Sequence, residues 1–271
     1  MMAGERSVGR EGLSPSAPRS SSMRPSLRDR LRGSREPSFG TWISSSSPVC
    51  ADALKGLGFD WYMIDTEHAQ VNPETLASIV ALLGPDDPAP LVRVGDVDQY
   101  LIKQALDAGA QGILVPLVST EVQARSAVAF AKYPPEGVRG IAAAPASRYG
   151  KELGAYLRRA NAETLVGVQI ETREALENLE AIAAVDGIDL LFVGPQDLTL
   201  NLGLVDERRH PKVREAMRQV VQACDRHDKL PGTLVVDAEE KRAAAELGFR
   251  FVSLASDVRF LINGARTFLG A

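Results

Sequence analysis

Several common features are scarce or missing in this 271-residue sequence. The two cysteines, Cys50 and Cys224, are far apart and lack CxxC or Cys/His spacing, which argues against a disulfide framework or a structural zinc site. No apolar run reaches the roughly 18 residues of a membrane span. The net charge of −4 gives no basic field for nucleic acid. The sequence therefore predicts a cytoplasmic protein that acts on small molecules and binds neither nucleic acid nor membrane.

Two further features are missing: a dinucleotide-binding motif, and apolar periodicity in the first 36 residues. No GxGxxG motif follows a predicted strand, so a dinucleotide-binding fold and a nucleotide cofactor are disfavoured. Residues 1–36 are rich in Ser, Arg, Pro and Gly and have almost no periodic apolar positions, which predicts a disordered extension. Acidic residues interrupt this stretch, so we favour a natural start at Met23 over a transit peptide.

From Phe39 onward, short β-type runs alternate with longer helical patterns. The predicted strands are residues 39–44, 59–65, 90–94, 112–116, 164–170, 187–193, 230–235 and 249–254. Alternation alone also fits an open doubly wound sheet, so the count of eight decides between the two. We predict a single (β/α)8 TIM barrel over residues 37–271. The long connection 137–160 is expected to cover the barrel mouth.

Polar side chains cluster where these strands end, which is where parallel barrels carry their active sites. They comprise residues 44–47, Asp65, Thr66, Glu67, His68, Arg93, Gln169, Glu171 and residues 194–197. Glu171 and Asp197 follow sequential strands, and facing carboxylates are suitable ligands for a hard divalent cation such as Mg²⁺ or Mn²⁺. The alternative is that both are solvated loop acids or helix caps.

Arg93 and His68 are the candidate catalytic groups. Arg93 lies in the apolar run Leu91-Val92-Arg93-Val94, where a guanidinium needs an anion, either a substrate oxygen or a strand-end acid. His68 follows two acids at a strand end, and an imidazole there can move protons. We assign it as the general base, although a purely hydrogen-bonding histidine is the alternative.

The turn 194–198 is a candidate binding site for a substrate carboxylate. It predicts a short helix whose first N–H groups, at Gln196 and Asp197, bind the carboxylate of a 2-oxo acid. None of the lysines falls at the carboxyl end of a predicted strand; they are Lys55, Lys103, Lys132, Lys151, Lys212, Lys229 and Lys241. A Schiff-base lysine is therefore not expected, and an enolate would need a metal and a cation such as Arg93.

From about Met23 to the C-terminus the chain resembles the HpcH/HpaI family of class II pyruvate aldolases, whose members cleave 4-hydroxy-2-oxo acids and 2-keto-3-deoxy sugar acids. The matching segments are Phe39-Gly40-Thr41-Trp42, Gly58-Phe59-Asp60-Trp61, Ile64-Asp65-Thr66-Glu67-His68, Val92-Arg93, Gln169-Ile170-Glu171-Thr172 and Gly194-Pro195-Gln196-Asp197-Leu198. Because residues 58–61 run into residues 64–68, these segments form five ordered motifs, and their number and order make the resemblance specific.

The resemblance implies reversible retro-aldol cleavage to pyruvate and an aldehyde through an enolate held by Mg²⁺, Mn²⁺ or Co²⁺. It implies that Glu171 and Asp197 bind the metal and that Arg93 stabilises the enolate. It also implies that Asp107 partners His68 and that Gln169 lies near the substrate. Homohexamers of swapped dimers, with residues 254–269 packing on a neighbour, are implied as well.

The sequence departs from the family pattern at Gln196, where many members have a small residue, and a larger side chain there is expected to narrow the pocket. Two other functions remain open at this point. Decarboxylation of oxaloacetate passes through the same enolate and needs no aldehyde pocket. A non-catalytic barrel would be expected to lose a metal-binding acid, and neither Glu171 nor Asp197 is missing.

Overall fold

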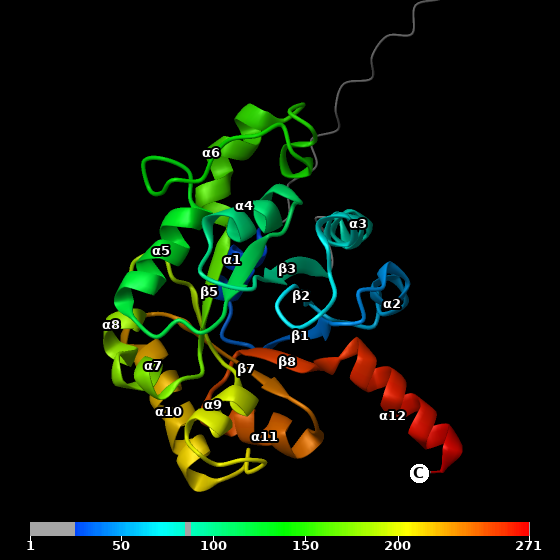
Figure 1. Cartoon of the computed structure of the whole chain (residues 1–271), viewed down its shortest axis with the longest axis vertical. Coiled ribbons are helices and arrows are strands. Elements are labelled where there is room, and N and C mark those ends of the chain that lie inside the picture. The colour runs from blue at the N-terminus through cyan, green and yellow to red at the C-terminus, as the bar shows by residue number, and fades with distance from the viewer. Residues whose placement is uncertain (1–24, 85–87, 271) are drawn as a thin grey trace, which may run out of the picture.

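The computed structural model describes residues 25–84 and 88–270, which form a closed barrel of eight parallel strands (Figure 1). The strands are β1 Ser38–Ile43, β2 Trp61–Asp65, β3 Ala89–Arg93, β4 Gly112–Val115, β5 Leu165–Ile170, β6 Leu190–Val193, β7 Leu230–Val235 and β8 Phe251–Ser256. Each strand pairs with the next in sequence, and β8 pairs with β1. The predicted (β/α)8 barrel is confirmed, and each predicted strand overlaps an observed one.

Helices connect the strands and cover the outside of the barrel (Figure 1). They are α1 Leu27–Gly33, α2 Pro48–Ala53, α3 Pro73–Leu83, α4 Gln99–Asp107, α5 Glu121–Ala131, α6 Leu153–Glu163, α7 Arg173–Glu177, α8 Leu179–Ala183, α9 Pro195–Asn201, α10 Pro211–Arg226, α11 Ala238–Leu247 and α12 Asp257–Leu269, with a 3₁₀ turn, η1, at Pro145–Ser147. Several begin at a polar cap whose side chain accepts a backbone N–H three residues on, as Asn72, Asp98 and Thr120 do. Within the described segments no helix is both long and apolar enough to cross a membrane.

The alternation of side chains along each strand separates two apolar cores. In β2, Trp61 and Met63 belong to the cluster inside the barrel, whereas Tyr62 and Ile64 pack with the surrounding helices. Trp61 stacks on Phe251 with ring centroids 3.8 Å apart. Gly40 makes room for that ring, because a Cβ at this position would lie 2.1 Å from Trp61 Cδ2. The filled interior leaves only the strand ends available for a site.

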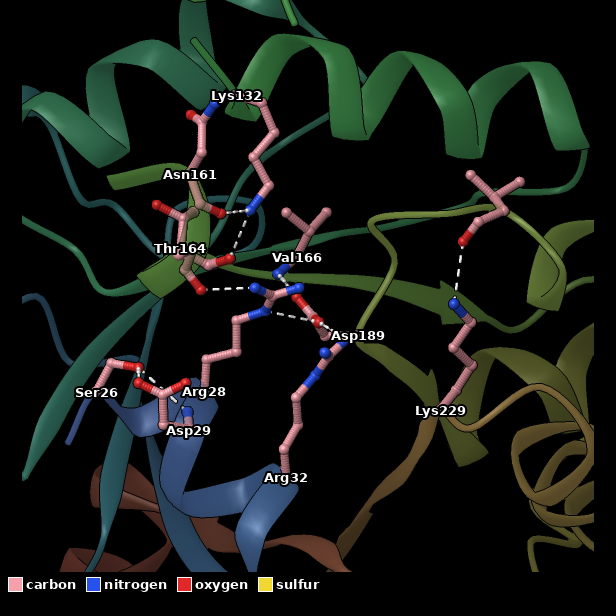
Figure 2. A network of polar contacts seen from close by, with 12 residues as sticks. Ser26, Arg28, Asp29, Arg32, Lys132, Asn161, Thr164, Val166, Asp189 and Lys229 are labelled. Atoms are coloured by element: carbon pink, nitrogen blue, oxygen red, sulfur yellow. Dashed lines mark hydrogen bonds and ion pairs between the residues drawn. The ribbon is translucent and has the colours of Figure 1, made fainter. Parts of the chain in front are cut away.

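The amino end of the barrel is closed by α1, so the disorder expected for residues 1–36 is wrong for this part of the segment. Leu27 and Leu31 are buried in the interior cluster. Figure 2 shows how the helix is fastened: Arg28 Nε and Arg32 Nη2 donate to the buried carboxylate of Asp189, at 2.8 and 3.0 Å. The sequence prediction failed because two leucines in one short helix give too little periodicity. Residues 1–24, including Met23, lie outside the described part of the chain.

The long connection between α5 and β5 does not cover the mouth of its own barrel, as residues 137–160 were expected to do. A helix that follows a strand returns the chain to the amino ends of the strands, and this connection starts where α5 ends. It contains η1 and α6, and α6 projects beside α4 and α5 in Figure 1. Arg139 donates to Asp107, the last residue of α4, at 2.7 Å. The segment therefore packs at the amino end of the barrel, opposite the carboxyl ends of the strands.

Candidate active site

Arg93 is the last residue of β3, and its guanidinium is fixed from several sides. Nε and Nη2 donate to the two carboxylate oxygens of Asp65, at the end of β2, over 3.0 and 2.7 Å. Nη1 lies 3.0 Å from Glu67 Oε2, and the guanidinium carbon lies 4.4 Å from the centre of the Trp42 ring. The predicted alternative of an ion pair with a strand-end acid is therefore present. It orients the arginine at the mouth, as expected for that pairing.

Glu171 directly follows β5 and is only 2% exposed. Its Oε1 accepts the backbone N–H of Leu117 at 2.9 Å, and its Oε2 accepts from Gln169 Nε2 at 2.6 Å. Burial, which is the largest cause, and the nearby charges of Asp197 and Glu67 together raise the pKa of this carboxyl to about 7, while the N–H of Leu117 and the charge of Arg93 oppose the shift. An anion at this position is costly unless a cation accompanies it.

Asp197 lies in the first turn of α9, after β6. The backbone at Gly194 passes so close to Glu171 that a Cβ there would lie 2.4 Å from Glu171 Oε2. This close approach brings the start of α9 beside the buried carboxylate. As first-turn residues, Gln196 and Asp197 have N–H groups without acceptors inside the helix. The Gln196 side chain is exposed.

The sequence placed Glu67 among the polar residues that follow a predicted strand, but it indicated no role for this side chain. Burial raises its pKa, while the charge of Arg93 opposes this shift. Its Oε2 is buried and has no hydrogen-bond partner, because the nearby Arg93 Nη1 lies within ion-pair distance but outside hydrogen-bonding geometry. The sequence feature that could have pointed to Glu67 is its position, two residues after a buried strand and next to a histidine.

His68 and Asp107 are not brought together in one chain. His68 lies at the mouth with its side chain 66% exposed, and its Nε2 lies 3.6 Å from Glu67 Oε1. Asp107 ends α4 and is bound by the fully buried side chain of Arg139. Since α4 runs back from the carboxyl end of β3 to the amino end of β4, the two residues lie at opposite ends of the barrel.

The donor set at the mouth is compatible with a divalent cation. In residues 25–84 and 88–270, no group of three or more His, Cys, Asp or Glu side chains is arranged to hold a metal. Glu171 and Asp197 are a pair of carboxylates close enough to repel each other, and one of them is buried. Mg²⁺ commonly binds through one or two carboxylates, with water and substrate oxygens completing its shell. The pair fits that pattern.

The carboxylates and the fixed arginine lie at the carboxyl end of the strands, which is where (β/α)8 barrel enzymes carry their active sites. Comparisons with known proteins define the class further. The family model described as HpcH/HpaI aldolase/citrate lyase matches residues 38–264. The 4-hydroxy-2-oxo-heptane-1,7-dioate aldolase of Salmonella paratyphi B (strain ATCC BAA-1250 / SPB7) is 40% identical over 245 residues, which cover 90% of this chain and 92% of that protein.

Two solved structures agree with this match. An HpcH/HpaI aldolase/citrate lyase family protein from Burkholderia cenocepacia J2315 has a TM-score of 0.85 at 37% identity, over 90% of this chain and 97% of that one. The HpcH/HpaI aldolase from Desulfitobacterium hafniense DCB-2 has a TM-score of 0.84 at 28% identity, over 91% and 96%. The chain belongs to the HpcH/HpaI aldolase/citrate lyase family and is a carbon–carbon lyase of the aldolase type.

Proposed function

We propose that this enzyme reversibly cleaves a 4-hydroxy-2-oxo acid to pyruvate and an aldehyde, and that Glu171 and Asp197 hold the divalent cation it needs. The observation that carries the proposal is the buried Glu171 carboxylate beside Asp197, with the Arg93 guanidinium at the same strand ends. The Salmonella relative is named for an acid of this class. The cation would supply positive charge to the oxygens of the 2-oxo acid.

The residues of the chain then have separate tasks. The base removes the proton of the C4 hydroxyl, the C3–C4 bond breaks, and its electron pair forms the enolate of pyruvate. We assign proton removal to His68, whose exposed ring can reach a substrate and which forms an ion pair with Glu67 when it is protonated. Arg93 stabilises the negative enolate oxygen, and a proton delivered to C3 completes pyruvate.

Binding of the 2-oxo acid is assigned to residues around the acid pair. The free first-turn N–H groups of Gln196 and Asp197 suit the substrate carboxylate. The Gln169 side chain donates from Nε2 to Glu171, and its Oε1 accepts from Arg93 Nη1 at 3.4 Å. Gln169 thereby keeps both side chains in place beside the substrate. The exposed Gln196 side chain is expected to narrow the entrance.

We further propose a homo-oligomer, with hexamers as the expected state. Helix α12 runs out from the barrel in Figure 1 and carries exposed apolar side chains, including Leu261 at 72% and Phe268 at 96% exposure. Several exposed apolar side chains gathered on one helix are a feature of protein–protein contact surfaces. If Asp107 partners His68, it must come from another copy, because one chain holds the two at opposite ends of the barrel.

The test is pyruvate release from a panel of 4-hydroxy-2-oxo acids and from oxaloacetate. EDTA-treated enzyme is assayed before and after Mg²⁺, Mn²⁺ or Co²⁺ is added. We expect cation-restored release from at least one hydroxy-oxo acid. Release from oxaloacetate alone would favour a decarboxylase, and release that does not depend on a cation would contradict the assigned site.

A further inference from the structure

Leu117 has an unusual backbone conformation directly after β4. Its φ is +54°, in the left-handed region that side-chain-bearing residues rarely adopt. The conformation turns the Leu117 N–H toward Glu171, where it donates to Oε1 at 2.9 Å. The strain is thus stored next to the acid to which we assign the cation, and strained residues of this kind cluster at functional sites.

The loop that carries Leu117 is otherwise held firmly. Val118 and Ser119 are buried on its carboxyl side. The Ser119 hydroxyl hydrogen-bonds to the hydroxyl of Thr172 at 2.7 Å, and Asn178 Nδ2 donates to the Ser119 carbonyl at 2.8 Å. These contacts connect the loop to the segment after β5, so Leu117 cannot turn inward without breaking them.

The side chain of Leu117 does not contribute to the core, because it is 51% exposed. Glycine would adopt the same backbone conformation without strain and would provide the same N–H for Glu171. Leucine here therefore has a conformational cost with little burial in return. Leu117 follows the carboxyl end of β4, so its exposed side chain belongs to the same end of the barrel as Glu171, the acid to which we assign the cation.

We propose that Leu117 forms an apolar wall for the aldehyde half of the substrate and selects aldehydes whose carbon next to the carbonyl bears no hydroxyl group. The inference rests on the proposed function. The polar atoms of the 2-oxo acid are assigned to Arg93, to the cation that Glu171 and Asp197 would hold, and to the first turn of α9. The aldehyde half is then the part that extends toward solvent and meets the isobutyl group. A hydroxyl placed against that group would lose its hydration without gaining a hydrogen bond.

The experiment compares propanal with glyceraldehyde as acceptors for pyruvate, because the two have equal carbon number and differ in hydroxylation. In each reaction the pyruvate methyl group loses a proton, a carbon–carbon bond forms, and the aldehyde oxygen gains a proton. We expect wild-type enzyme to have the higher kcat/KM with propanal. We expect Leu117→Gly to lower the propanal to glyceraldehyde ratio about tenfold, the scale of discrimination by one small apolar contact.

Two further variants make the result interpretable. Leu117→Asn also tolerates the left-handed conformation and should lower the ratio even if the glycine variant folds poorly. Leu57, which is 68% exposed and precedes β2 at the opposite end of the barrel, is the control, and Leu57→Asn should leave the ratio unchanged. Active Leu117 variants with the wild-type ratio overturn the inference alone. Absence of turnover by wild-type enzyme with any aldehyde overturns the proposed function and this inference with it.

Discussion

Glu171→Gln is predicted to stabilise the metal-free protein at pH 8 and to abolish its stabilisation by divalent cations. The folded-state pKa of Glu171 is raised by burial from 4.5 to about 7. Between these values the folded protein binds more protons than the unfolded chain, so stability should fall as pH rises from 4.5 to 7. At pH 8 the buried carboxylate is ionised, and a pKa shift of this size corresponds to a loss of roughly 3 kcal/mol in the free energy of unfolding.

The glutamine keeps the shape of the side chain but removes this charge. It still accepts the Leu117 N–H, while the contact with Gln169 Nε2 must be rearranged, at a cost of about 1 kcal/mol. A net gain of about 2 kcal/mol remains, which for a chain of this size corresponds to a rise in Tm of roughly 4–8 °C. A bound cation removes the same penalty in the wild-type protein. The stabilisation by the cation and the stabilisation by Glu171→Gln should therefore not be additive.

The assay is thermal unfolding of EDTA-treated wild-type and Glu171→Gln protein from pH 4.5 to 8, each with and without Mn²⁺. The metal-free wild type should lose stability over that interval, and the variant should lose less. At pH 8 Mn²⁺ should raise the Tm of the wild type only. Equal stabilisation of both proteins by Mn²⁺, or a metal-free variant less stable than wild type at pH 8, would refute the reasoning.

Three other substitutions test the remaining assignments. His68→Ala should lower kcat by about 10²–10⁴-fold, the usual contribution of a general base, and near-normal aldol rates would remove His68 from that role. Arg93→Lys should lower kcat by about 10²-fold, because an ammonium cannot reproduce the fork that binds Asp65; steady-state kinetics with a folded variant would measure this. Asp189→Ala should destabilise the protein by about 3 kcal/mol in urea unfolding, since the mostly buried Arg28 loses its partner, and a loss below 1 kcal/mol would contradict the fastening of α1.

The barrel could be predicted because each strand is a short apolar run and eight of them fit along the chain. Glu171 and Asp197 could be singled out as a candidate pair because parallel strands place the residues that follow them at one end of the barrel, and the structure brings the two residues close together. Glu67 received no role, since its significance depends on burial and on Arg93, which sequence spacing does not reveal. Asp107 was assigned by resemblance alone, and the fold separates it from His68 within one chain. The left-handed conformation of Leu117 had no sequence signal, because leucine is not the residue that this backbone favours.

The proposed function requires Glu171 and Asp197 to hold the divalent cation together. Anomalous scattering of Mn²⁺ in crystals of the wild-type enzyme soaked with MnCl₂ and pyruvate would locate the cation. We predict one strong peak in contact with carboxylate oxygens of both residues, and its loss in Glu171→Gln crystals. A peak elsewhere, or none at these residues while the same enzyme remains dependent on Mn²⁺ for pyruvate release, would contradict the account.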